Sequence, residues 1–259
     1  MKDSHSLLFL GTCAADFSPR LETDLKDVFD REIRRASCAL LDGRYMIDCG
    51  PHAIRALAIA GKKGADVDDL FFTHLHSDHF RVDAVASLAA QKKTPLNVWV
   101  REDADFPQIP GVVLHRMTLT KTYRVTETLS VTGLPANHDQ RAFPQWLLFE
   151  IGGKRLLYAL DGAWFVNDAY NYLTGKTLNA LVLDCTVGDY IGDYRLAEHN
   201  SIPMIRLMLP SLKTTAIIDD ATTVYVSHLA QTLHRGFDET VRAAGNDFRV
   251  AYDGLEISI

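Results

Sequence analysis

The sequence contains few cysteines and no pattern among them. Only Cys13, Cys38, Cys49 and Cys185 occur, and no two of them form a C-x-x-C pair. This scarcity argues against a disulfide framework and against a zinc site built from cysteines. We therefore expect a protein of a reducing environment, with the cytoplasm as its location.

Long apolar runs are also missing. Near the N-terminus only residues 7–10 are consecutively apolar, and four residues are too few for a signal peptide or a membrane span. No internal repeat is evident. We therefore expect no membrane partner and one large domain over residues 1–259, since 47% hydrophobic content supports a sizeable core at this length.

An excess of positive charge is the third absence. Lysine and arginine number 27 against 33 acidic residues, which gives a net charge of −6. This balance weighs against a broad basic face that holds extended nucleic acid. A small anionic substrate remains compatible, because bound metal ions can outweigh the overall charge locally.

Histidine and aspartate, in contrast, are concentrated in one short stretch. His74, His76, Asp78 and His79 directly follow the apolar residues 70–72, which are typical of a buried strand. Side chains two residues apart on extended backbone point to the same side, so His74 and His76 can bind one ion. Imidazole and carboxylate ligands suit zinc, manganese or iron. The stretch therefore predicts a metal site.

Strands and helices alternate along the rest of the chain. Asp42-Gly43 predicts a hairpin over residues 38–47, and a second hairpin is expected over residues 145–160. Helices are expected over 82–90, after Ser201, and over 229–244, with a surface excursion containing some helix over 16–35. A final hairpin is expected over 248–259, and His5 is expected at the surface. This alternation predicts an α/β fold in which two mixed β-sheets face one another with helices outside.

The H-x-H-x-D-H motif at residues 74–79 resembles the signature of the metallo-β-lactamase superfamily. The other motifs of that superfamily follow in order, each at the end of an expected strand or loop: Asp48, His138, Asp161 and His228. The resemblance covers nearly the whole chain. It implies an αββα sandwich, in agreement with the pattern of strands and helices.

The same resemblance implies a binuclear metal site. The implied ligands are His74, His76 and His138 for one ion and Asp78, His79 and His228 for the other, with Asp161 bridging. Asp48 is expected to orient a ligand imidazole. A di-iron flavoprotein would carry an acidic residue where His76 stands, so the resemblance points to Mn²⁺ or Zn²⁺, which ligand softness does not separate.

Two further segments resemble the PhnP-like phosphoribosyl 1,2-cyclic phosphate phosphodiesterases. Residues 183–186 followed by 197–201 are similar to a strand end and a histidine before a helix in that family, and residues 252–257 are similar to its final hairpin. The resemblance implies a homodimer that hydrolyses a small cyclic phosphate or cyclic nucleotide. It implies His199 as the general acid, with Asp78 and Asp48 as the other candidate catalytic residues.

Three alternative functions are also compatible with the sequence. A tRNA 3′-processing nuclease of the same superfamily would need a basic arm, but residues 189–194 are acidic and aromatic. A thioester or lactam hydrolase would use the same metal chemistry without a proton donor at His199. A metal-binding accessory protein on the same scaffold would not be an enzyme.

Overall fold

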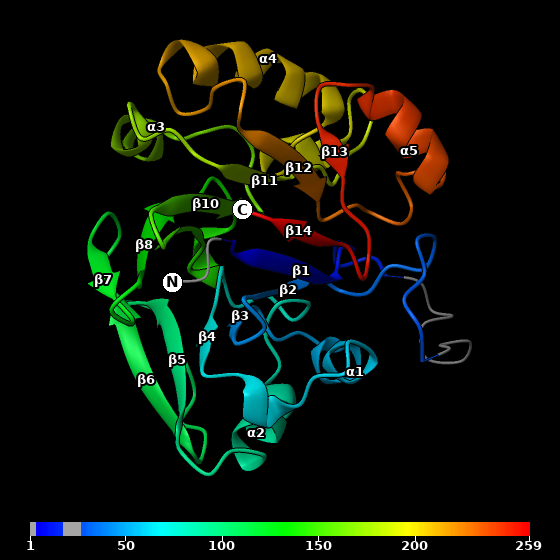
Figure 1. Cartoon of the computed structure of the whole chain (residues 1–259). Helices are drawn as coiled ribbons and strands as arrows, with labels where there is room; N and C mark the ends of the chain where they lie inside the picture. Colours follow the sequence, from blue (N-terminus) through cyan, green and yellow to red (C-terminus); the bar gives the residue numbers. More distant parts are fainter. Residues whose placement is uncertain (1–3, 18–26) are drawn as a thin grey trace.

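The computed structural model describes residues 4–17 and 27–259. Two seven-stranded β-sheets face one another, and helices cover the outer face of each sheet (Figure 1). Both sheets contain parallel and antiparallel pairs, so the expected sandwich of two mixed sheets is confirmed. Within the described residues, no helix combines the length and hydropathy that a membrane-spanning segment needs.

The first sheet has the strand order β14-β1-β2-β3-β4-β5-β6. Its strands are β1 (Ser6–Gly11), β2 (Cys38–Leu41), β3 (Tyr45–Ile47), β4 (Asp69–Phe71), β5 (Leu96–Arg101), β6 (Val112–Met117) and β14 (Glu256–Ser258). Helices α1 (Ala53–Ile59) and α2 (Val82–Ala90) lie on its outer side (Figure 1).

The second sheet has the order β13-β12-β11-β10-β9-β8-β7. Its strands are β7 (Thr122–Arg124), β8 (Leu129–Pro135), β9 (Gln145–Ile151), β10 (Lys154–Ala159), β11 (Ala180–Asp184), β12 (Thr223–Ser227) and β13 (Arg249–Val250). Helices α3 (Asn167–Leu173), α4 (Ile202–Thr214) and α5 (Phe237–Ala244) cover it. Short 3-10 helices lie at η2 (Gly64–Asp66), η3 (Gln140–Ala142) and η4 (Tyr194–Ala197).

The core has separate layers because successive side chains on a strand point to opposite faces. In β1, Phe9 packs between the sheets, whereas Leu10 packs against the helices of the first sheet. The two sheets meet through aromatic contacts such as Phe71 against Phe149, whose ring centroids lie 5.2 Å apart at an interplanar angle of 85°. The central strands of each sheet are therefore buried on both faces.

Several local predictions are confirmed. The hairpin over 38–47 turns at Asp42 and Gly43, with φ values of 51° and 70°. Helix α2 spans residues 82–90 as expected, and the Ser201 side chain accepts a hydrogen bond from the Met204 N–H at the start of α4. These features were predictable because a few neighbouring residues determine each of them.

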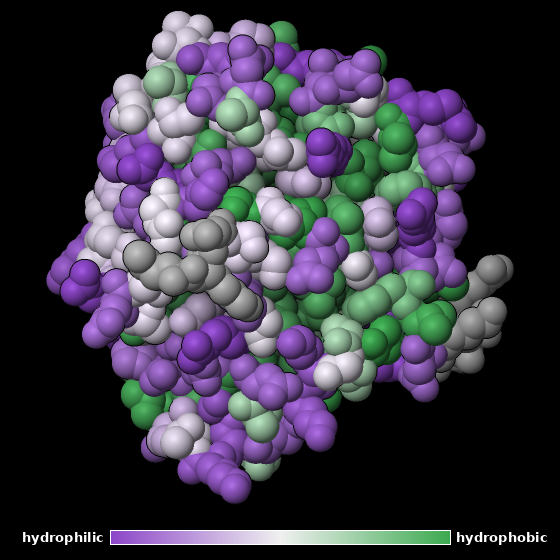
Figure 2. Space-filling view, viewed as in Figure 1, coloured by the Kyte–Doolittle hydropathy of each residue, from purple (hydrophilic) through white to green (hydrophobic). Residues whose placement is uncertain are grey.

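The expected final hairpin is wrong. β13 pairs parallel with β12 in the second sheet, whereas β14 pairs antiparallel with β1 in the first sheet. Residues 251–255 therefore cross from one sheet to the other. On the face shown in Figure 2, apolar side chains gather over β13 and β14, which line one open cavity, and hydrophilic residues cover most of the remainder.

Three smaller expectations also need correction. The helix expected over 229–244 is limited to α5, because residues 229–230 instead follow the backbone of residues 12–14 and 186. His5 is buried and lies 2.7 Å from Asp42. In the excursion over 16–35, residues 18–26 lie outside the described residues. The described part contains no helix, and Arg34 and Arg35 are buried.

Candidate metal centre

The site lies where strand ends from both sheets meet. β3 and β4 run parallel in the first sheet, and β10, β11 and β12 run parallel in the second. Within each sheet the carboxyl ends of these strands therefore lie at the same edge. Asp48, Asp161 and His228 follow β3, β10 and β12, and their φ values are 62°, 50° and 58°. Such left-handed backbone is uncommon for residues other than glycine and is concentrated at functional sites.

Three histidines form the first cluster. His74 Nε2 and His138 Nε2 each lie 3.1 Å from His76 Nδ1. Nitrogens bound tetrahedrally at roughly 2.0–2.1 Å from one zinc ion would be separated by about 3.3 Å, so the spacing fits a single divalent ion. His74 and His138 are buried, and His76 is partly exposed.

The second cluster combines one carboxylate with two imidazoles. Asp78 Oδ2 lies 3.3 Å from His79 Nε2 and 3.6 Å from His228 Nε2. The two imidazole nitrogens are 3.2 Å apart, and all three residues are buried. This donor set also suits a divalent cation.

Asp161 lies between the two clusters. Its Oδ2 is 3.0 Å from His79 Nε2 and 3.1 Å from His228 Nε2. Its Oδ1 faces the first cluster, 3.9 Å from His74 Nε2 and 3.8 Å from His138 Nε2. Neither the His79 nor the His228 nitrogen forms a hydrogen bond with the buried Oδ2, which is unpaired among the described residues, as expected for an oxygen that binds an ion. The donors therefore fit two divalent ions with a shared carboxylate.

Asp48 lies behind the clusters. Its Oδ2 is 2.8 Å from His79 Nδ1 and accepts a hydrogen bond from the Thr73 hydroxyl, and its Oδ1 accepts one from the Thr73 N–H. The Thr73 hydroxyl lies in turn 3.1 Å from His74 Nδ1. These contacts fix imidazole orientation in both clusters, which corresponds to the orienting position expected for Asp48.

Asp184 is, like Asp48, a buried carboxylate that lies behind the clusters, and the sequence analysis assigned it no role. Its Oδ2 lies 2.8 Å from His199 Nδ1 and 3.2 Å from His228 Nδ1. Its Oδ1 accepts hydrogen bonds from the backbone N–H groups of Thr186 and Asn200. One carboxylate therefore orients both a candidate ligand and the candidate general acid. The sequence signal that could have identified Asp184 is its position at the end of β11, which runs parallel to two strands that lead to candidate ligands.

The pKa values of the buried histidines are shifted in opposite directions in the two clusters. Burial lowers the pKa of His74 and His138, which favours the neutral imidazoles that bind metals. Burial also opposes the charged form of His228, but the Asp161 carboxylate outweighs it and raises the pKa of His228 to about 10. Conversely, the imidazoles of His228 and His79 overcome the effect of burial and hold the pKa of Asp161 well below its usual range.

The clusters open into a cavity of about 390 Å³. His199 lines it, with its ring stacked at 13° on that of His228 and a centroid separation of 5.5 Å. Burial lowers the pKa of His199, but the Asp184 carboxylate outweighs it, so this pKa lies above its ordinary value. The cavity is also lined by Tyr194 and Arg195, and it brings together every candidate site residue except the deeper His74, His79 and Asp48.

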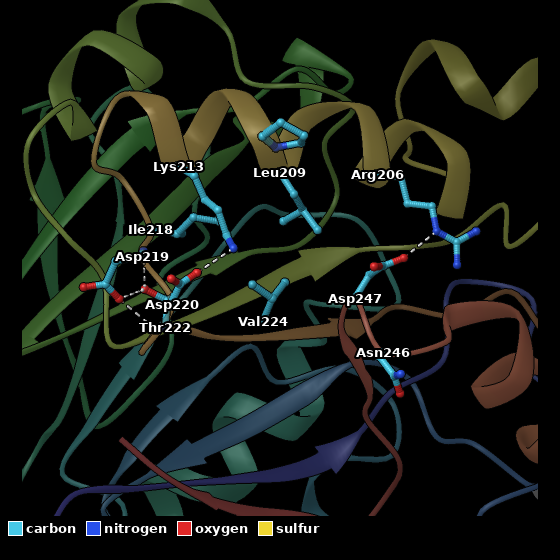
Figure 3. A pocket seen from close by; sticks show the side chains of 11 residues that line it. Arg206, Leu209, Lys213, Ile218, Asp219, Asp220, Thr222, Val224, Asn246 and Asp247 are labelled. Carbon is cyan, nitrogen blue, oxygen red and sulfur yellow. Dashed lines mark hydrogen bonds and ion pairs between the residues drawn. The ribbon is translucent and has the colours of Figure 1, made fainter.

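A larger cavity, of about 600 Å³, lies elsewhere, between α4 and the loops next to β12 and β13 (Figure 3). Four of its charged side chains form two ion pairs, Arg206 with Asp247 and Lys213 with Asp220. Its floor is apolar, with Leu209 and Val224 facing each other across it (Figure 3). No group of ligating side chains converges there among the described residues, so size alone does not identify the reactive site.

Comparison with known proteins agrees with the motifs. A family model of the metallo-beta-lactamase superfamily matches residues 34–83. No curated protein sequence matches the chain. Among solved structures, a new diphosphatase from the PhnP family matches with a TM-score of 0.74 and 19% identity, covering 99% of this chain and 97% of that one.

Two further structures are similar over comparable lengths. The short form of human tRNase Z matches with a TM-score of 0.69 and 19% identity, covering 98% of this chain and 100% of that one. Zinc-bound PqqB from Methylobacterium extorquens matches with a TM-score of 0.69 and 17% identity, again covering 98% and 100%. The resemblance to the metallo-β-lactamase superfamily is confirmed, and the chain has the metallo-β-lactamase fold.

Proposed function

We propose that this protein is a binuclear metal-dependent hydrolase that cleaves a small phosphodiester, such as phosphoribosyl 1,2-cyclic phosphate or a cyclic nucleotide. The observation that supports the proposal most strongly is the position of His199. Its Nδ1 lies 2.8 Å from a fully buried carboxylate, and its ring lines the same cavity as the two clusters. A positioned proton donor beside a metal centre suits a substrate whose leaving group is an alcohol.

The clusters would hold two divalent ions, Mn²⁺ or Zn²⁺. When bound, such ions activate water near neutral pH and stabilise negative charge on the phosphoryl group. The chain then has two tasks. Asp48 and Asp184 keep the ligand imidazoles in fixed orientations, and Asp78 supplies a carboxylate that faces both the second cluster and the cavity.

His199 would complete the reaction. Because Asp184 engages its Nδ1, Nε2 is the nitrogen that can donate a proton to a ligand in the cavity. That proton goes to the oxygen of the departing alcohol as the phosphorus–oxygen bond breaks. General acid catalysis of this kind contributes roughly 10²–10⁴-fold in rate.

A small substrate is favoured over an extended nucleic acid. The cavity has a volume of about 390 Å³, and the net charge of −6 provides no excess of cations to bind a phosphate backbone. Arg195, which lines the cavity, is already paired with Asp193 at 2.8 Å. We therefore place a small anionic ester, and not tRNA, in the cavity.

The test compares two leaving groups. Metal-loaded protein should hydrolyse both bis(p-nitrophenyl) phosphate and a 2′,3′-cyclic nucleotide. His199→Ala should slow the cyclic nucleotide by roughly 10²–10⁴-fold and the nitrophenyl ester much less, because p-nitrophenolate leaves without a proton. His115→Ala, on β6 of the first sheet, is the matched control and should leave both rates unchanged.

Other outcomes would identify the alternatives. Turnover of thioesters or lactams without phosphodiesters would overturn the substrate class. Cleavage of precursor tRNA in preference to cyclic nucleotides would indicate a nuclease. A metal-loaded protein that hydrolyses none of these esters or amides would favour an accessory role. Equal slowing of both phosphodiesters by His199→Ala would remove the general acid assignment.

A further inference from the structure

His138 differs at its outer nitrogen from the other buried candidate imidazoles, His74, His79 and His228. The partly exposed His76 has its outer Nε2 3.7 Å from Asp139 Oδ2. A ligating imidazole normally donates its second N–H to a carboxylate, a carbonyl or water. The outer nitrogens of His79 and His228 lie within 3.2 Å of buried carboxylates, and that of His74 lies 3.1 Å from a threonine hydroxyl. His138 Nδ1 is buried and has no hydrogen-bond partner among the described residues.

One carboxylate lies just beyond hydrogen-bond reach of this nitrogen. Glu198 Oε2 is 3.6 Å from His138 Nδ1. The Glu198 side chain is 47% exposed and accepts no hydrogen bond from the residues that the structure describes, so it is free to rotate inward. Bulk water does not reach the buried nitrogen. A shift of well under 1 Å would bring the pair to an ordinary N–H···O distance.

We propose that Glu198 is the residue that positions His138 in the three-histidine cluster. Its carboxylate accepts the Nδ1–H of His138, which fixes the tautomer in which Nε2 presents its lone pair to the ion. The inference rests on the metal centre of the proposed function. It assigns Glu198 to one ion only, because the second cluster has Asp48 and Asp184 as its own outer carboxylates.

The local backbone supports this pairing. Glu198 follows η4, and the preceding Ala197 carbonyl accepts a hydrogen bond of 3.4 Å from the Asn137 side chain, beside His138. The loops that carry His138 and Glu198 are therefore tied to each other. His199 is the next residue, so one short segment orients a ligand of the first cluster and carries the proton donor.

The experiment measures both ions. Zn²⁺ is titrated into metal-free protein against a chromophoric chelator to give two dissociation constants. Glu198→Ala should weaken one ion by roughly 10–100-fold and leave the other unchanged. Glu198→Gln should lose less, because the amide oxygen still accepts the N–H. Glu256→Ala, an exposed carboxylate on β14, is the matched control and should change neither constant.

A double-mutant cycle assigns the effect to His138. His138→Ala removes the partner, so adding Glu198→Ala to that variant should cause no further loss of affinity. Additive losses, equal weakening of both ions, or wild-type affinities in Glu198→Ala would overturn the inference. A wild-type protein that binds two ions but cleaves no phosphodiester would overturn the proposed function and leave the role of Glu198 intact.

Discussion

Single buried polar residues determine the geometry around the metal centre, and His52 shows the same principle away from it. His52 Nδ1 accepts a hydrogen bond of 3.1 Å from the Ala36 N–H, which requires that nitrogen to be unprotonated. Burial, reinforced by the nearby cations of Arg35 and Arg55, lowers the pKa of His52 from 6.5 to about 4. The neutral form of His52 therefore stabilises the folded chain.

This shift predicts a pH dependence of stability. The unfolded chain binds a proton at His52 below its pKa of 6.5, whereas the folded chain does so only near 4. The stabilisation is therefore fully present above pH 6.5 and is lost as the pH falls toward 4, by on the order of 2–3 kcal/mol. His52→Asn keeps an acceptor for Ala36 without titrating, so it should lose less stability over that range.

Urea unfolding of metal-free protein at pH 7.5 and pH 4.5 checks this expectation. The free energy of unfolding should fall more for the wild type than for His52→Asn. Parallel losses in the two proteins would show that His52 does not titrate in this window.

At the scale of elements, the loop after β4 depends on the chain that follows β3. The Cys49 N–H donates to the His79 carbonyl at 2.8 Å, and the Arg81 N–H donates to the Cys49 carbonyl at 3.0 Å. A Cβ atom at Gly50 would lie 1.8 Å from the Asp78 carbonyl oxygen. Only glycine permits this approach, so a residue outside the motif fixes the position of the motif's Asp78 and His79.

Gly50→Ala should therefore displace the ligand loop. We expect a loss of roughly 1–3 kcal/mol in the free energy of unfolding, because a tightly packed backbone must move. We also expect weaker binding of the second ion. Chemical denaturation and metal titration measure the two effects. Gly175→Ala, where φ is 77° and the space is open, strains the backbone away from the ligand loop. It therefore controls for a general loss of stability and should leave metal binding unchanged.

At the scale of the whole molecule, the candidate metal centre joins the two sheets. The loop after β4 in the first sheet provides His74 and its neighbours, whereas β8, β10 and β12 of the second sheet lead to His138, Asp161 and His228. Ions bound by both sets would connect the halves of the sandwich. Ligands that bind only the folded state stabilise it by mass action.

Metal removal should therefore lower the melting temperature. An ion at 100 times its dissociation constant contributes about 2.7 kcal/mol, which corresponds to a decrease of roughly 5–10 °C for a chain of this size. Thermal unfolding before and after chelation, and again after Zn²⁺ is restored, measures the change. An unaltered melting temperature after verified removal would contradict an ion that bridges the sheets.

The extent to which sequence predicted this molecule depended on how local each determinant was. The hairpin at Asp42-Gly43 and the cluster at residues 74–79 are encoded within a few residues, so both were predicted. Asp184 was not assigned, because its partners His199 and His228 lie 15 and 44 residues away along the chain. Local patterns identify strands and ligands, whereas partners distant in sequence are set by topology.

The last two strands show the same limit. Residues 248–259 have the pattern of a hairpin, yet Arg249 pairs with Tyr225 and Ile257 with Leu7. The choice depends on which sheet edges are free, and no short sequence window contains that information. Asp253, in the turn between these two strands, is buried and accepts hydrogen bonds from Thr12 and Arg35.

That crossing has a mechanical consequence. Because residues 249–258 provide an edge strand to each sheet, the sheets can separate on that side only if one of the two edge strands detaches from its sheet. The segment therefore holds the two sheets together on that side. Adjustment to an incoming molecule must then come from the rim, where the segment from Tyr190 to His199 lies between solvent and the ligand clusters.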